Sequence, residues 1–147
     1  MSARLLHRRH LLLAASSAYL GLARPAQACE YFSSHLRIWH PWTRATRVDA
    51  DTARLCMRFD EVQRSDRLIG AQTPVAGGVR LAGPGAQDLP LSIREGETLA
   101  LTEDGLHLEL LDLQQPLQIG RSYPLRLIFE FAEPVNATLN VDFGGLR

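Results

Sequence analysis

The sequence predicts an all-β domain, an antiparallel sandwich or barrel of short strands. In several short runs, apolar side chains alternate with polar ones, which is the period of a half-buried strand. Glycine, proline and aspartate residues separate these runs, and after residue 28 almost no stretch has the 3.6-residue period of a helix.

The predicted strands follow one another along the whole domain. In chain order they are Leu36–Trp39, Arg54–Phe59, Arg67–Ala71, Gly78–Leu81, Thr98–Leu101, Leu106–Leu111, Tyr123–Phe131 and Val135–Phe143. Pro41 is expected to stop the first strand, because proline cannot donate to a sheet ladder. The polar segment Pro41–Thr52 is expected to cross between sheets. Asp104-Gly105 predicts a hairpin turn between the fifth and sixth strands.

The first 28 residues predict an export signal. Arg4, Arg8 and Arg9 form a basic start, Leu11–Ala23 is free of charge, and Ala26-Gln27-Ala28 has the small-x-small pattern of a cleavage site. The uncharged run is shorter than the ~20 apolar residues that span a bilayer. We therefore expect a periplasmic protein, exported by the general secretory or the twin-arginine route. The alternative is a lipoprotein junction at Ala28-Cys29, which Ala26 and Gln27 fit poorly.

Cleavage after Ala28 leaves a single domain over residues 29–147. The predicted signal holds four arginines and no acidic residue, so the mature chain has 12 basic and 16 acidic residues and a net charge of −4. A mildly acidic domain without a basic cluster has no electrostatic reason to bind nucleic acid. No further apolar run is long enough to span a membrane, so the mature form is expected not to cross one.

Two cysteines and three histidines remain after the predicted cleavage. In an oxidising compartment Cys29 and Cys56 are expected to form a disulfide; a thiolate metal site is the alternative. Without the disulfide, the Cys29 thiol and α-amino group, His35 and His40 could form an N-terminal metal site. The alternative places both imidazoles at strand ends without a metal.

A second candidate metal site is the pair His107 and Glu109. Residues two apart on a strand point to the same face, so this pair could offer one nitrogen and one carboxylate to an ion. The alternative is two solvent-facing side chains beside a turn. No nucleophile elbow, zinc-protease motif or P-loop is present, and we expect a protein that is not an enzyme.

Several segments, in order, resemble the periplasmic copper chaperones called PCu(A)C. They are His40–Thr46, Asp66–Ala71, Pro74–Leu81, Gly105–Leu108, Leu113–Gly120 and Tyr123–Glu130. The resemblance covers Leu36–Val141. It implies a cupredoxin-like, immunoglobulin-like β-sandwich that binds copper and helps to deliver it to the copper centre of cytochrome oxidase.

The family site uses an early His, a later Met and a final His-x-Met pair, and this chain departs from that pattern. The final pair falls on His107 and Glu109, so its Met is replaced, and the early His falls on Ala82. Neither Met nor His occurs between Gly83 and Asp104. We therefore expect either a copper carrier with a degenerate or relocated site or a metal-free interaction module. The implied partners are the copper ion, cytochrome oxidase or another copper-handling protein.

Overall fold

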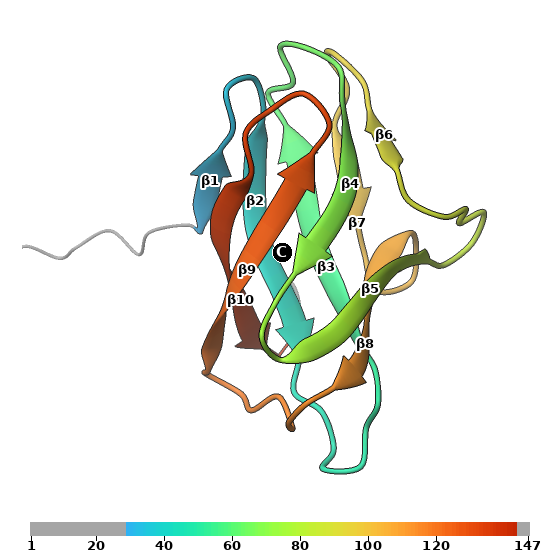
Figure 1. The fold of residues 1–147 in the computed structure, drawn as a ribbon, viewed down its shortest axis with the longest axis vertical. Coiled ribbons are helices and arrows are strands. Elements are labelled where there is room, and N and C mark those ends of the chain that lie inside the picture. The colour runs from blue at the N-terminus through green and yellow to red at the C-terminus, as the bar shows by residue number, and fades with distance from the viewer. Residues whose placement is uncertain (1–28, 144–147) are drawn as a thin grey trace, which may run out of the picture.

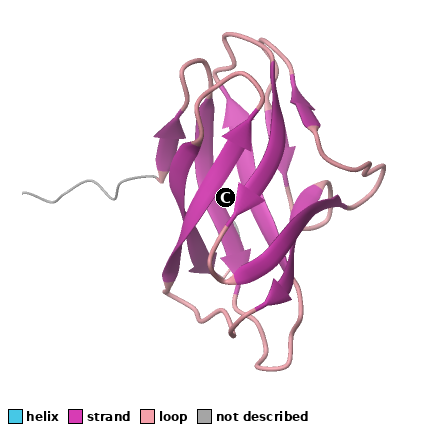
Figure 2. Ribbon diagram, in the orientation of Figure 1, coloured by secondary structure: helices cyan, strands magenta, loops and turns pink. Residues whose placement is uncertain are grey.

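The computed structural model describes residues 29–143, which fold into ten strands without a helix (Figure 1, Figure 2). The strands are β1 Glu30–Phe32, β2 Arg37–Arg44, β3 Ala53–Asp60, β4 Asp66–Gln72, β5 Ala76–Ala82, β6 Leu91–Ile93, β7 Leu99–Leu101, β8 His107–Leu113, β9 Ser122–Phe129 and β10 Val135–Asp142. The predicted signal peptide lies outside the described residues. Within those residues, no helix is long and apolar enough to cross a membrane.

The strands form a nearly closed β-sandwich, which confirms the predicted fold class. Along the sheet the order is β5-β8-β3-β2-β10-β9-β4-β6, with β1 added to β2 and β7 added to β3. Strand β5 begins this order and β4 stands next to last in it, yet the two strands lie close together. This contact nearly closes the sheet on itself. All neighbouring strands are antiparallel except β10 and β2, which run parallel.

Alternating side chains from both sides of the sandwich fill its core. On β9, Leu125, Leu127 and Phe129 are buried while the residues between them are more exposed. Phe129 meets Phe59 of β3 in an edge-to-face contact with ring centroids 6.3 Å apart. This packing has the period of two that the sequence shows.

Pro41 does not end the first long strand, as the sequence predicted. Strand β2 continues to Arg44 through a β-bulge, and its register with β3 shifts between Trp39 and Trp42. At the bulge, His40 takes a positive φ of 47°. A bulge leaves a residue outside the ladder, so a proline without an N–H can be accommodated there. The first third of the segment expected to cross between sheets, Pro41–Arg44, therefore belongs to strand β2.

The predicted hairpin at Asp104-Gly105 is also wrong. Strands β7 and β8 do not pair with each other; both pair with β3, one after the other along the same edge. The residues between them form a loop closed by a hydrogen bond from Thr102 N to Leu106 O of 2.8 Å. The residues between β7 and β8 therefore form a loop that connects two strands running in the same direction along β3. They do not reverse the chain as a hairpin turn would.

A buried carboxylate, Asp66, ties three segments of the sandwich together. Its side chain is 0% exposed and accepts backbone hydrogen bonds from Arg67 (2.7 Å), Phe131 (3.0 Å) and Ala132 (3.0 Å). His35 Nε2 donates a fourth, of 2.9 Å. Burial alone would raise the pKa of Asp66, but these hydrogen bonds to the ionised form lower it overall.

Replacing Asp66 with Ala should lower the free energy of unfolding by about 3 kcal/mol at pH 7. The substitution leaves buried N–H donors at the start of β4 and in the β9–β10 turn without an acceptor. Urea denaturation followed by circular dichroism measures the difference. Glu130→Ala is the matched control: it breaks a partly exposed ion pair with Arg67 and should change the free energy of unfolding much less than Asp66→Ala does.

The Asp66 contribution should also depend on pH. Because the folded pKa lies below the unfolded value of about 3.9, the contribution is present above that pH and is lost as pH falls through the folded pKa. The stability gap between the wild type and Asp66→Ala should therefore narrow below about pH 4. A gap that stays constant down to pH 2 would contradict the assignment.

Candidate metal site

His107 opens β8 directly opposite the position where the PCu(A)C pattern has its early histidine. The β5–β8 register pairs Ala82 with His107, so the two family ligand positions face each other across one ladder. Directly opposite residues have Cβ atoms about 5 Å apart, close enough for two imidazoles to share an ion. In this chain only one of the two is an imidazole.

A hydrogen bond to the loop that precedes β8 fixes the His107 ring. Its Nδ1–H donates to the Gly105 carbonyl at 2.8 Å, and the side chain is only 6% exposed. Gly83 allows this close approach: it has a φ of 106°, and a Cβ there would lie 2.3 Å from the Gly105 carbonyl oxygen. The ring is thus fixed in one tautomer with Nε2 as the nitrogen that can accept a metal.

Glu109 shares the outer face with His107 but is engaged by an arginine. Arg80, its register partner on β5, donates to the Glu109 carboxylate from Nε at 2.6 Å. A carboxylate already neutralised by a guanidinium is a poor metal ligand. The residues at the family position therefore do not fit a cuprous ion, because one imidazole without sulfur ligands cannot hold a soft cation tightly.

Two arginines hold the loop before His107 against the sheet. Arg44 of β2 forms a two-pronged ion pair with Glu103, whose Nη2–Oε2 arm measures 2.9 Å. Arg54 of β3 donates to the Glu103 carbonyl at 2.7 Å. The hydrogen bond from Arg44 lowers the pKa of Glu103, so this clamp is charged at neutral pH.

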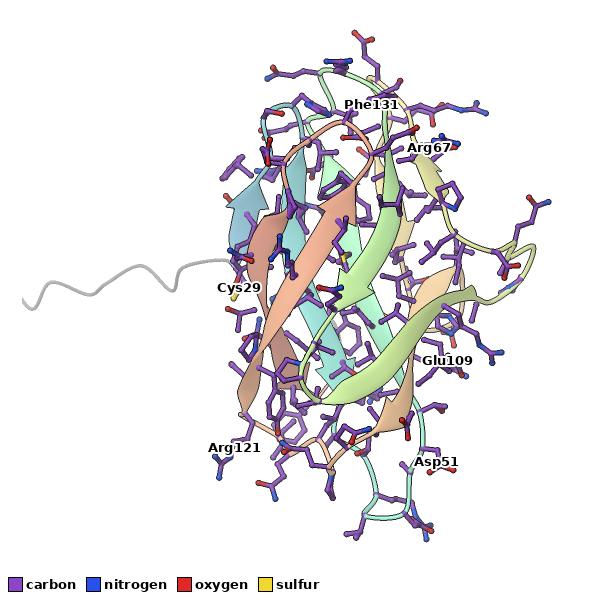
Figure 3. All side chains as sticks on the ribbon, in the orientation of Figure 1. Cys29, Asp51, Arg67, Glu109, Arg121 and Phe131 are labelled. Carbon is purple, nitrogen blue, oxygen red and sulfur yellow. The ribbon has the colours of Figure 1, made fainter. Side chains whose placement is uncertain are left out.

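Of the N-terminal candidates, His35 lies apart from Cys29 and His40. His35 Nε2 is bound to Asp66, whereas His40 Nε2 donates to Asp142 of β10 at 3.2 Å. Within residues 29–143, no group of three His, Cys, Asp or Glu side chains is arranged to hold a metal. Figure 3 shows Cys29 and Glu109 on opposite sides of the molecule, so the two candidate sites are separate.

The structure corrects the predicted disulfide. Cys29 and Cys56 are not bonded, because β1 and β3 lie on opposite edges of β2. Strands two places apart are separated by roughly 10 Å, whereas a disulfide needs Cα atoms within about 7 Å. Cys56 is fully buried beside Trp42, and burial raises the pKa of its thiol to about 12.

Thiol titration should reveal one reactive cysteine in the folded protein. Cys29 is half-buried and should react with a disulfide reagent, whereas Cys56 should react only after denaturation because its thiolate is scarcely populated. The Cys29→Ser variant should show no reactive thiol when folded and one when unfolded. Two protected thiols that appear only after reduction would show that the cysteines pair.

Sequence reasoning missed the side chains around His40. Asn140 and Asp142 alternate with core residues on β10 and so point outwards, toward Cys29 and His40. The period of β10 was visible in the sequence, but its parallel pairing with β2 was not. Next to this region, a cleft of about 320 Å³ is lined by Trp39, Trp42 and the loop after β7.

Comparisons with known proteins agree with this fold. The family model described as "Putative lipoprotein LpqE-like" matches residues 36–141. The copper-bound PCuAC domain from PmoF2 is 27% identical with a TM-score of 0.71, over 77% of this chain and 97% of that one. No curated protein matched the sequence.

Two further solved structures show the same fold at lower identity. The apo PCuAC domain from PmoF1 is 24% identical with a TM-score of 0.71, over 77% of this chain and 98% of that one. The Cu(I) form of DR1885 from Deinococcus radiodurans is 24% identical with a TM-score of 0.63, over 73% and 79%. At this identity the two structures show that the fold is shared.

Restoring the missing imidazole should create a metal-binding pair. In a Cys29→Ser background, Ala82→His should raise the affinity for Cu(I) about tenfold or more, equivalent to about 1.4 kcal/mol. The reason is the direct cross-strand position of His107. Competition with a chromophoric Cu(I) chelator measures the change. The matched control, Asn136→His, puts a histidine on the exposed face of β10 and should leave the affinity unchanged.

Proposed function

Because the chain belongs to the LpqE-like family and is a divergent PCu(A)C-type protein, we propose that it handles copper outside the cytoplasm. Its task would be copper delivery or the assembly of a copper centre such as that of cytochrome oxidase. No catalytic role is proposed. The observation that carries this proposal is the match of the sandwich to a copper-bound PCuAC domain along 97% of that domain.

The chain's own residues suggest how it would take part. His107 offers one nitrogen at the family position, and Glu109 beside it is paired with Arg80. Such a position can contribute a ligand to an ion that a partner protein also holds, but it cannot retain a cuprous ion alone. The protein would therefore act by meeting another copper-handling protein. The basic, uncharged and small-residue regions of the first 28 residues support export to the periplasm.

A second candidate function is a metal-free interaction module. The Arg80–Glu109 ion pair favours it, since a guanidinium stands where an ion would have to approach Glu109. In this reading the protein contributes only a binding surface to copper-centre assembly.

Deletion of the gene in the native host tests the copper-handling proposal. We expect lower cytochrome oxidase activity under copper limitation, because delivery to the oxidase would be slowed, and recovery when copper is added. The wild-type gene should complement the defect, and His107→Ala should complement it poorly. Full complementation by His107→Ala would favour the metal-free module. Unchanged oxidase activity and unchanged copper content of the periplasm and membranes would contradict the proposal.

A further inference from the structure

We propose that Cys29 and His40 form a second site, for a cuprous ion, where β1, β2 and β10 meet, and that Asp142 positions the His40 ring. The inference rests on the proposed function in copper handling and names where this chain could bind the metal itself. It uses none of the positions of the family pattern.

The backbone places the two ligands opposite each other. The β1–β2 register pairs Glu30 with Trp39, so the preceding residue, Cys29, falls opposite His40. The His40 N–H donates to the Cys29 carbonyl at 2.7 Å, which extends the ladder to this pair. The site therefore lies on paired strands and not on a loose terminus.

The two side chains also lie over the same face of β10. The Cys29 sulfur accepts a hydrogen bond from Asn140 Nδ2 at 3.4 Å, and His40 Nε2 donates to Asp142 at 3.2 Å. Asn140 and Asp142 are two residues apart on β10, so they share a face and are about 7 Å apart. Thiol and imidazole thus stand over neighbouring positions of one strand, within reach of a shared ion after a side-chain rotation.

The bulge in β2 turns the imidazole toward this face. His40 has a φ of 47°, a left-handed conformation that is uncommon for residues with a Cβ and is imposed here by the bulge. Its ring is 7% exposed and lies beside the Trp39 ring, with centroids 5.7 Å apart. With Nε2–H directed to the Asp142 carboxylate, Nδ1 keeps the lone pair, the usual carboxylate–histidine–metal arrangement.

The donor set selects the ion. A thiolate and an imidazole suit Cu(I), whereas zinc prefers four ligands and magnesium prefers oxygen. No third His, Cys, Asp or Glu completes a cluster within residues 29–143, and Cu(I) is the ion that accepts two donors. On binding, the Cys29 thiol releases its proton to solvent and the sulfur–copper bond replaces the sulfur–hydrogen bond.

Competition of the exported protein with bathocuproine disulfonate for Cu(I), without oxygen, tests this site. We expect one Cu(I) per chain, with sulfur and nitrogen scatterers in X-ray absorption. Cys29→Ser and His40→Asn should each abolish competitive binding. Asp142→Asn should weaken it about tenfold and Asp142→Glu should retain it, as expected for a residue that positions a ligand. The thiol control is Cys56→Ala, which should bind like the wild type; circular dichroism verifies that each variant is folded.

Three results would overturn the site: no Cu(I) retained by the wild type, unchanged binding in folded Cys29→Ser, or an intact mass showing a lipid on Cys29, which would occupy the sulfur. Any of these together with an oxidase defect in the deletion strain would remove this site and leave the proposed function standing. Cu(I) binding with these ligands in a strain that lacks any copper defect would keep the site and contradict the function.

Discussion

Strand β2 passes a proline in the middle of the sheet, where a residue without an N–H cannot join a ladder. The bulge at His40 and Pro41 resolves this conflict, and the surrounding structure depends on it. Before the bulge β2 pairs with β1 and after it with β10, while β3 occupies the other edge throughout. The same bulge sets the positive φ of His40 and turns its imidazole to Asp142. Without the bulge, the His40 ring would lie on the face of β2 that the alternation of side chains along the strand predicts.

The central position of β2 also explains why the two cysteines have different chemistry. Cys56 lies on β3 opposite Trp42, where burial keeps its thiol protonated, whereas Cys29 is half-buried beside β10. Keeping them apart preserves a thiol on the outer surface that a disulfide would have consumed. One sandwich therefore carries two separate histidine positions, His107 with a weakened ligand set and His40 next to a sulfur.

Polar side chains stabilise two separate regions of this sandwich. Asp66 gathers backbone donors from β4 and the β9–β10 turn together with His35, and Arg44 and Arg54 hold the loop that leads to His107. The loop can be held in this way because β7 and β8 follow one another along β3 instead of forming a hairpin. These contacts fix the loop that leads to His107 against the sheet.

The sequence by itself determined the all-β class and most strand positions, because the alternation of apolar and polar side chains is a local property. It also indicated that His107 and Glu109 share a face. Only the tertiary structure decided that Cys29 and Cys56 stay apart, that Ala82 faces His107, and that Asp142 meets His40. Strands β1 and β6 were missed for the same reason: three residues carry too little pattern, and pairing with distant partners defines them. Strand order and register arise from contacts between residues far apart in the chain, which no local pattern specifies.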